Sequence, residues 1–223
     1  MPANPAPPFA DPEPHGFIYL GFHADKPQKS PLYHQTPTRR REATRLVEAA
    51  KAISRRPDVH SVRVFRALLI PPMSGAPRHD LAMLIRTAQT DDLDHIRQTE
   101  EIKGLDGEEI LAGLNAARIG ETEADLDATF LFNHFAMTGE ADPEAAWRSL
   151  TGWYTSKIGV DNSTALRPTG SSRFALVNYV RLPTAPPLFL LNQILRPSFH
   201  RVVRGTLKTN GMRALPGFYR MVR

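Results

Sequence analysis

The sequence predicts an α+β fold in which two β-α-β-β-α-β units close into one barrel with helices on its outside. Strand-like alternation and helix-like periodicity follow each other in this order, and the order occurs twice within the 223 residues. Both faces of the predicted sheets are apolar, whereas helices can cover only one. Two sheets in one chain can bury their remaining faces against each other, and we expect a ligand pocket between them.

The first unit is predicted at residues 16–120, and a proline-rich segment precedes it. Residues 1–15 contain six prolines and are expected to form an extended, disordered arm. The predicted elements that follow are a strand at 17–24, a helix at 39–55, strands at 59–69 and 80–86, and a helical segment at 91–117 interrupted near 104–107.

The second unit is predicted at residues 128–223, and it repeats this order. A strand at 129–136 precedes a helix that Asp142 caps and that begins with Pro143, a combination typical of helix N-termini. Gly159 is expected to end this helix. The remaining predicted elements are strands at 162–167 and 173–182, a helix at 188–208 kinked at Pro197, and a strand at 215–222.

Each unit has the element order of a ferredoxin-like split β-α-β-β-α-β fold, which suggests an internal repeat. Three pairs of segments align between the units, namely 19–24 with 131–136, 56–66 with 158–167, and 80–86 with 175–181. Identity is low, so the agreement lies in element order, length and turns. On the first strands, the alignment matches Tyr19, Gly21 and His23 with Leu131, Asn133 and Phe135.

Several classes of protein are excluded or left unsupported by composition and motifs. Because there is no cysteine, disulfides, thiolate metal sites and Cys nucleophiles are excluded, and a cytoplasmic location is expected. No apolar run reaches the roughly 20 residues of a membrane-spanning helix, and the N-terminus lacks a secretory-signal pattern. The motifs GxSxG, GxGxxG and the P-loop are absent, so hydrolase, dinucleotide and nucleotide functions lack support.

Charge is unevenly distributed along the chain. The net charge is +5, but residues 162–223 contain ten Lys or Arg and no Asp or Glu, which leaves −5 on the first 161 residues. The basic C-terminal helix could therefore attract an anionic ligand, an acidic lipid or an acidic protein surface, or could simply be solvated. No nucleic-acid-binding motif accompanies it, so nucleic acid is not expected. Both a monomer and a homodimer are compatible with two sheets in one chain.

The second unit resembles the dimeric α/β-barrel superfamily, and most nearly its antibiotic-biosynthesis-monooxygenase branch. The resemblance lies in FLFNHFA at 130–136, the helix at 143–158, GVDNSTALR at 159–167 and FALVNYV at 174–180, and it extends loosely to the first unit. It implies a barrel fold and one of several activities: cofactor-independent oxygenation of aromatic polyketides, haem degradation, or ligand binding without known chemistry. Where the oxygenases tend to have Trp four residues after a strand Asn, this chain has Asn178 and Leu182.

Asn133 and Asn178 are the main candidates for catalytic residues. They lie on the first and third strands of the second unit, which this topology makes antiparallel neighbours, so both could reach one pocket and hydrogen-bond a substrate carbonyl or oxyanion. Alternatively, the two amides satisfy each other. His23 is the third candidate, as a general base or hydrogen-bond donor at the barrel mouth, or it is a structural histidine at the end of a strand.

The substrate-binding candidates lie on the first strands of the two units, on the helix at 143–158, and at the end of the strand at 173–182. They are Tyr19, Leu131, Phe135, Trp153 and Leu182. Trp153 lies about 100° from the apolar stripe of its helix, so it is expected to be exposed or to face a groove. His134 alternates with the pocket-facing positions and is expected to pack against the helices.

These observations favour an enzyme that oxygenates or cyclises a hydrophobic aromatic metabolite without metal or flavin. A non-catalytic ligand-binding or interaction barrel is the alternative. Because no two histidines have metal-ligand spacing on one helix, a metal is not expected. The third and weakest alternative is haem binding, for which His95 and His200 are candidates by location on helices after a third strand.

Overall fold

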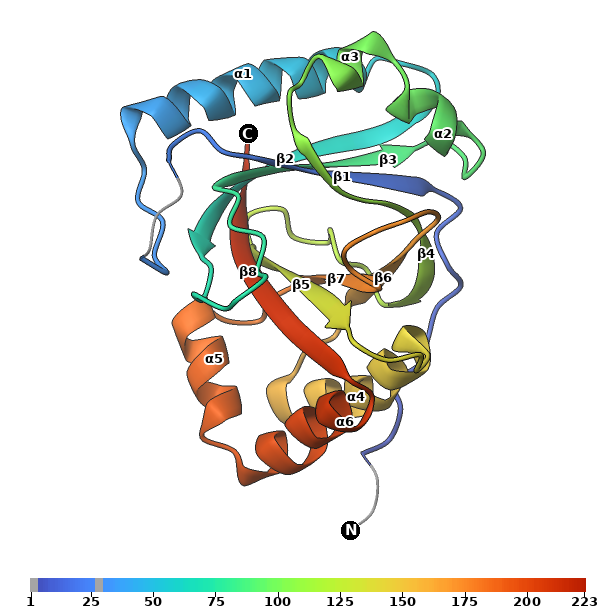
Figure 1. Ribbon diagram of the computed structural model, residues 1–223, viewed down its shortest axis with the longest axis vertical. Coiled ribbons are helices and arrows are strands. Elements are labelled where there is room, and N and C mark those ends of the chain that lie inside the picture. Colours follow the sequence, from blue (N-terminus) through green and yellow to red (C-terminus); the bar gives the residue numbers. More distant parts are fainter. Residues whose placement is uncertain (1–3, 27–29) are drawn as a thin grey trace.

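The computed structural model describes residues 4–26 and 30–223, and its centre is one closed, eight-stranded antiparallel barrel (Figure 1). Around the barrel the strands follow the order β1-β3-β2-β8-β5-β7-β6-β4. The predicted α+β barrel is therefore confirmed, and closure leaves no strand edge exposed. The strands are β1 (Gly16–Phe22), β2 (Val59–Leu69), β3 (Leu81–Thr87), β4 (Glu108–Ile119), β5 (Thr129–Met137), β6 (Ser163–Pro168), β7 (Leu176–Arg181) and β8 (Met212–Val222).

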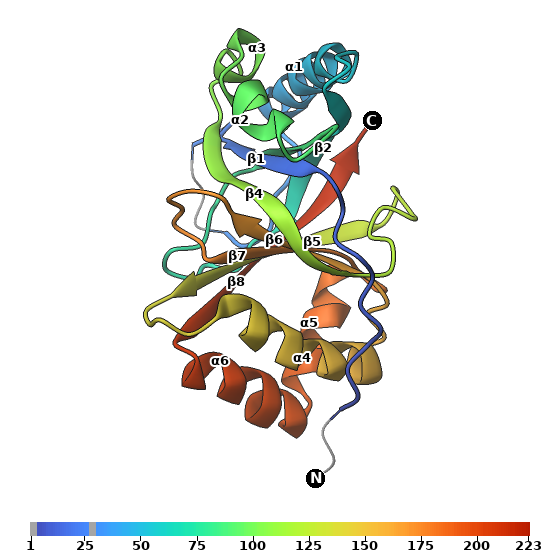
Figure 2. The ribbon, with the colours of Figure 1, turned by 90° about the vertical axis from the view of Figure 1, so that its right-hand side faces the viewer.

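Helices cover the barrel on two opposite sides (Figure 2). One layer lies over strands of the first half and the other over strands of the second half, and the element order β-α-β-β-α-β is the same in both halves. The first layer contains α1 (Pro37–Ile53), α2 (Asp92–Arg97) and α3 (Glu100–Lys103). The second contains α4 (Pro143–Ile158), α5 (Pro186–Ile194), the π-helix η1 (Phe199–Arg204) and α6 (Gly205–Thr209).

Aromatic side chains fill the inside of the barrel. The Phe132 ring stacks on the rings of Tyr19 and Tyr179, with centroids 4.8 and 4.7 Å away, and Phe65 meets it edge-on at 5.2 Å. An eight-stranded barrel is just wide enough for side chains to fill. The interior is therefore a core, and it is not the ligand pocket that the sequence predicted between the sheets.

The side chains of β5 face the opposite way from the prediction. His134, expected among the helices, is fully buried inside the barrel, where its Nδ1–H donates to the Leu215 carbonyl at 2.9 Å. Asn133 faces the helix layer instead. Successive strand residues point to opposite faces, so an error of one residue in assigning the buried face inverts the whole strand.

The segment at 108–117, predicted as helix, is part of strand β4. Its sequence, EEILAGLNAA, is rich in good helix formers. In the barrel it pairs with β1 on one side and β6 on the other. These two ladders override the local helix preference, since strand stability depends mainly on neighbouring strands and burial.

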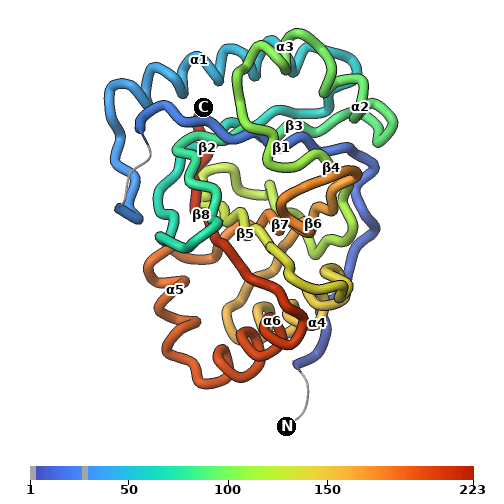
Figure 3. Tube along the Cα trace, in the orientation of Figure 1, coloured from blue at the N-terminus to red at the C-terminus, as the bar shows by residue number. Residues whose placement is uncertain are grey.

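The single kinked helix predicted at 188–208 is divided into three elements. α5 ends at Ile194, and η1 begins at Phe199 after Pro197, which cannot continue a helix without losing a backbone hydrogen bond. After the break the chain turns back (Figure 3), and η1 and α6 lie beneath α4 (Figure 2). It also leaves apolar side chains of α5 exposed, including Leu188 at 60% and Leu191 at 52%.

The proline-rich N-terminal segment was expected to be a disordered arm, but its described part lies along the barrel and α4. Ala10 forms a bridge with Arg118 of β4, and the Glu13 amide donates to the Asn115 side chain at 2.8 Å. Phe9 contacts Trp147 of α4, with ring centroids 6.0 Å apart. Residues 1–3 lie outside the described part of the chain.

Candidate functional site

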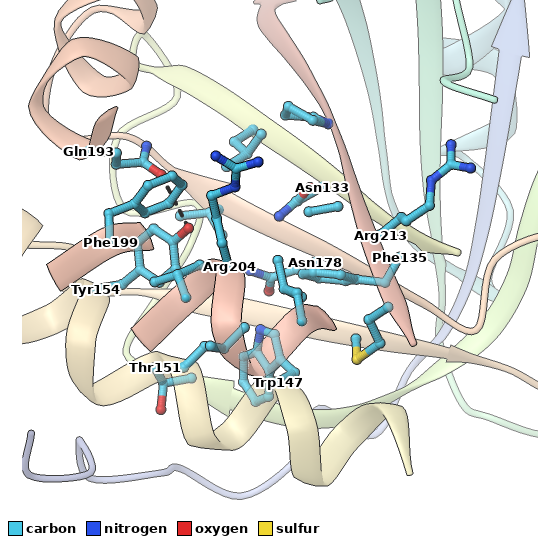
Figure 4. A pocket seen from close by; sticks show the side chains of 18 of the residues that line it. Asn133, Phe135, Trp147, Thr151, Tyr154, Asn178, Gln193, Phe199, Arg204 and Arg213 are labelled. Atoms are coloured by element: carbon cyan, nitrogen blue, oxygen red, sulfur yellow. Dashed lines mark hydrogen bonds between the residues drawn. The ribbon is translucent and has the colours of Figure 1, made fainter. Parts of the chain in front are cut away.

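A large pocket lies outside the barrel, between the second half of the sheet and α4, α5, η1 and α6. Its volume is about 1130 Å³, which is large enough for a multi-ring small molecule. The sheet supplies Leu131, Asn133, Phe135, Asn178 and Val180, and the helices supply mostly apolar side chains opposite them. Figure 4 shows the asparagines on the sheet side and Trp147, Thr151 and Tyr154 on the α4 side.

Asn133 and Asn178 are direct partners across β5 and β7, so the expected antiparallel neighbourhood is confirmed. Both side chains line the pocket. Asn178 Oδ1 accepts a hydrogen bond of 2.5 Å from the Ser163 hydroxyl, which orients its amide group. Asn133 Oδ1 is buried and has no hydrogen-bond partner among the described residues. The pair therefore offers an unused acceptor in a mostly apolar pocket.

The charged side chains that line the pocket are all basic. Arg204, Lys208 and Arg213 belong to this lining, and it includes no Asp or Glu from the described part of the chain. Such a site favours an anionic group or a group that becomes anionic, because the cations stabilise the charged form. These cations come from the acid-free C-terminal segment, whose composition the sequence already revealed.

A tyrosine and a glutamine connect α4 with α5 at the helix side of the pocket. The Tyr154 hydroxyl donates to Gln193 Oε1 at 3.1 Å, and Gln193 donates in turn to the Phe189 carbonyl. Burial raises the pKa of Tyr154, which keeps its hydroxyl protonated. No local sequence pattern singles out Tyr154 or Gln193, because their contact joins residues from two separate helices.

Two of the predicted substrate-binding residues line this pocket and three do not. Leu131 and Phe135 lie on its sheet side. Tyr19 is fully buried inside the barrel, because its strand face corresponds to that of Phe132 rather than Leu131. The alignment between the two first strands was therefore displaced by one residue.

Trp153 and Leu182 are core residues beside the pocket and do not line it. The exposed fraction of Trp153 is 1%, and its indole N–H donates to the Ser198 hydroxyl at 3.1 Å. The prediction that Trp153 is exposed or faces a groove is wrong, because the turn between α5 and η1 covers that side of α4. Leu182 is also buried, within the cluster that contains Trp153 and Phe189.

His23 lies apart from the asparagines, in a second cluster of polar residues. It does not line the large pocket. Its ring lies beside the tilted ring of His79, with ring centroids 4.6 Å apart. The His79 Nε2–H donates to Glu108 at 2.9 Å. Burial lowers the pKa of His79, with His23 adding to the shift, so its ring is neutral at pH 7. Spacing in the sequence could not reveal this cluster, since its three residues come from distant segments.

A buried chain of hydrogen bonds runs through the barrel interior towards this second cluster. His134 Nε2 accepts from the Tyr19 hydroxyl at 3.2 Å, and Tyr19 lies against Tyr219, whose hydroxyl donates to the His79 carbonyl at 3.3 Å. Complete burial lowers the pKa of His134 to about 4. His134 is thus a neutral structural group at pH 7, and it is separated from the large pocket by the sheet.

Comparison with known proteins found similar structures but no similar sequences. No protein-family model matches the chain, and no curated protein sequence matches it. It is similar to the crystal structure of an anthrone oxidase-like protein, with a TM-score of 0.60, 14% identity, and coverage of 95% of this chain and 92% of that one.

Two chlorite dismutase structures are also similar. One is described as the putative chlorite dismutase TA0507, with a TM-score of 0.50 and 10% identity over 94% of this chain and 95% of that one. The other is a mutant chlorite dismutase from Candidatus Nitrospira defluvii, with a TM-score of 0.50 and 12% identity over 94% and 92%. At such low identity these likenesses establish the fold alone, which is a closed α+β barrel.

Proposed function

We propose that the large pocket binds a hydrophobic aromatic metabolite and that the chain oxidises it with dioxygen, without metal or flavin. The observation that carries this proposal is the unpaired Asn133 Oδ1 beside Asn178 in an apolar wall. A buried acceptor without a partner costs roughly 1–3 kcal/mol, and a ligand hydroxyl would relieve that cost. The similarity to an anthrone oxidase-like protein agrees with an aromatic substrate.

The pocket's shape and lining suit a flat ligand with a polar edge. Apolar side chains such as Leu131, Phe135 and Trp147 would contact its rings. Asn133 Oδ1 would accept a hydrogen bond from a ring hydroxyl, and the Asn178 amide would donate to a neighbouring carbonyl or phenolate oxygen. This arrangement would fix the orientation of the ligand through its polar edge.

The basic lining supplies the electrostatics that such an oxidation needs. A methylene group between two aromatic rings that are also joined by a carbonyl must first lose a proton to become electron-rich enough to reduce dioxygen. Cations at Arg204, Lys208 and Arg213 would stabilise the resulting anion and lower its pKa. In the balanced reaction, the methylene and one dioxygen molecule give a ring carbonyl and one water molecule.

The experiment for this proposal combines ligand binding with oxygen consumption. Hydroxylated tricyclic aromatic ketones would be titrated while Trp fluorescence is followed, since Trp147 lines the pocket. Dioxygen uptake and product absorbance would then be measured with the ligands that bind. Asn133→Leu should weaken binding by about tenfold or more, corresponding to at least about 1.4 kcal/mol. Asn192→Ala on α5 is the control, since Asn192 is exposed and bonds only to Arg196.

The same experiment separates catalysis from binding alone. If ligands bind in an Asn133-dependent manner but neither dioxygen uptake nor product appears, the chain is the non-catalytic binding barrel that the sequence left as an alternative. If no aromatic ligand binds, or if Asn133→Leu binds as tightly as the unchanged chain, the proposed site is wrong. A contribution of the basic lining of the pocket to the binding of anionic ligands would be measured from the salt dependence of the affinity.

Haem is a cofactor that the fold family suggests, but the lining residues do not suit its iron. His200 is the histidine among the described lining residues. Its Nε2–H donates to the Ile194 carbonyl at 2.9 Å, and its Nδ1 accepts from Arg204 at 3.4 Å, so neither nitrogen is available for an axial bond. His95 is exposed on α2, beside Asp58. A haem titration without a Soret shift would agree with this geometry.

Three further proposals concern the origin of the two halves, the location of the protein and its oligomeric state. We propose that the halves at 16–120 and 128–223 are diverged copies of one unit, supported by their identical element order and by the matching strand orders β4-β1-β3-β2 and β8-β5-β7-β6. We also retain the cytoplasm as the proposed location and a monomer or homodimer as the proposed state. In the described part of the chain, no helix is both long and apolar enough to cross a membrane.

A further inference from the structure

Three side chains of the kind that bind transition metals meet outside the large pocket. His23 follows β1, His79 precedes β3, and Glu108 begins β4. One donor atom from each lies within 4.8 Å of the donor atoms of the other two. Their exposure differs, because His79 is buried whereas His23 and Glu108 reach the surface. The cluster is therefore anchored on a buried ring and open on one side.

The register of the first sheet brings these residues together. Across β1 and β4, Gly21 pairs with Glu108, and across β1 and β3, Phe22 pairs with Leu81. His23 is two residues beyond Gly21 and therefore emerges on the same face of its strand. The meeting of the three side chains follows from backbone pairing and does not depend on flexible loops.

A buried carboxylate holds the two histidine-bearing segments in place. Asp80, the neighbour of His79, accepts hydrogen bonds from the amides of Ala24 and Asp25 at 2.8 and 3.1 Å. The Asp80 carboxylate also forms an ion pair with Arg39 at 2.8 Å, where both side chains are almost fully buried. The backbones that carry His23 and His79 are thus tied to each other, which preorganises the cluster.

The His79 ring is held against a glycine and has an unused nitrogen. A Cβ atom at position 21 would lie 2.4 Å from the ring, so only glycine leaves space for it. The exposed fraction of His79 is 2%, and its Nδ1 has no hydrogen-bond partner among the described residues. The ring is therefore fixed in place, with its Nε2 aimed at the Glu108 carboxylate.

We infer that His23, His79 and Glu108 bind a divalent transition-metal ion of the zinc class. The ion would replace the Nε2 proton between His79 and Glu108, and that proton would be released on binding. Two imidazoles and one carboxylate are a common ligand set for Zn²⁺ with a fourth position left to water. Nothing in this site depends on the proposed oxidation in the large pocket.

The geometry needs only a small adjustment and leaves an open position. Tetrahedral Zn²⁺ places its ligand atoms roughly 3.4 Å apart, so the exposed His23 ring would move inwards and the 2.9 Å contact between His79 and Glu108 would lengthen. Because His23 and Glu108 reach the surface, water would occupy the fourth position.

The test is metal binding by the full chain, freed of any affinity tag and of metal. Zn²⁺ would be titrated calorimetrically, and Co²⁺ would be added to look for the visible absorption of a four- or five-coordinate site. We expect one ion per chain. His23→Ala and Glu108→Gln should each weaken Zn²⁺ binding at least about tenfold and remove the Co²⁺ spectrum. Both variants change exposed side chains, so their folding can be verified by an unchanged Tm without metal.

His95→Ala provides the matched control. His95 is also a surface histidine near a carboxylate, 3.8 Å from Asp58, but it lacks a second histidine. It should leave both the Zn²⁺ affinity and the Co²⁺ spectrum unchanged. Absence of binding to the unchanged chain would overturn the inference. So would equal affinity in the His23 and Glu108 variants, or loss of binding in the His95 variant.

Discussion

The two helix layers of this barrel cover equivalent sheets in different ways. In the first half, α1 packs Leu46 and Ile53 directly on the outer face of β1–β3, in one continuous apolar cluster. In the second half, α4 and the segments after Pro197 stand away from β5, β7 and β8 and enclose about 1130 Å³. The same topology thus yields a closed core on one side and a ligand-sized pocket on the other.

The difference originates in the second crossover of each half. The first half crosses over through the short helices α2 and α3, which bury Leu93, Ile96 and Ile102 against the sheet. The second half uses a longer segment broken at Pro197, and α5 exposes Leu188 and Ile194 at 60% and 55%. A helix that does not bury its apolar stripe contributes little to stability, so this half gives up packing in return for a cavity.

The largest expected effect compares one leucine from each helix layer. Leu46→Ala on α1 should lower the free energy of unfolding by about 3–4 kcal/mol, because the new cavity is closed on all sides. Leu150→Ala on α4 should cost about 2 kcal/mol, because Leu150 already borders the pocket. Urea unfolding of both variants measures the difference. Equal losses would show that the second helix layer is packed as tightly as the first.

The buried histidine of the barrel predicts how stability depends on pH. Because the folded-state pKa of His134 is about 4 and its ordinary value is 6.5, the unfolded chain takes up the proton first as the pH falls. Stability from this group is complete above about pH 6.5 and declines down to pH 4, by a total of about 3 kcal/mol. Unfolding in urea across this range would measure the decline.

A variant isolates the contribution of that single histidine. His134→Phe keeps an aromatic ring beside Tyr19 and Phe174 but cannot take up a proton. Its stability should fall less steeply between pH 6.5 and 4, and the remaining slope should come from other groups such as His79, whose pKa burial also lowers. An unchanged slope in His134→Phe would show that His134 does not govern acid stability.

A smaller effect of opposite sign is expected on the sheet side of the pocket. Asn133→Leu should raise the free energy of unfolding by about 1 kcal/mol, because it removes a buried acceptor that has no partner. The paired strand position Asn178 provides the comparison, since Asn178→Leu breaks the bond from Ser163 and should destabilise the fold. Thermal unfolding of both variants without ligand checks the signs. A stabilised Asn178→Leu would contradict this assignment of roles.

The helix caps of the two layers should make small contributions of similar size. Thr36 caps α1 by accepting from the Arg39 amide, and Asp142 caps α4 by accepting from the Glu144 amide. Thr36→Ala and Asp142→Ala should each cost about 1 kcal/mol. Chemical denaturation would compare them. A marked difference between the two losses of stability would show that the helix ends, and not packing alone, distinguish the two layers.

Several elements could be predicted from local sequence because local interactions determine them. α4 runs from Pro143 to Ile158 as predicted, with Asp142 as its cap and Gly159 in the left-handed conformation, at φ 78°. β2 was likewise predicted at its observed bounds. Caps, turn residues and periodic patterns act over a few residues, so a sequence window contains their full cause.

The candidate site was predictable only in part. Asn133 and Asn178 could be paired in advance because the strand order of a ferredoxin-like unit makes β5 and β7 neighbours. The face they occupy could not be fixed, since both faces of β5 are apolar and alternation alone does not say which lies inside. The prediction that Trp153 is exposed was wrong for a related reason. The segment that covers its ring contains Ser198, which is 45 residues away in the sequence.

The sequence by itself determined the α+β barrel, the order of most elements and the basic composition of the C-terminal segment, because composition and periodicity are properties of the chain. Tertiary structure alone decided that aromatic rings fill the barrel, that the pocket lies outside it, and that β4 is a strand. It also decided that His23 meets His79 and Glu108. Each of these outcomes depends on which distant segments pair or pack, and long-range pairing leaves no local trace in the residues that it joins.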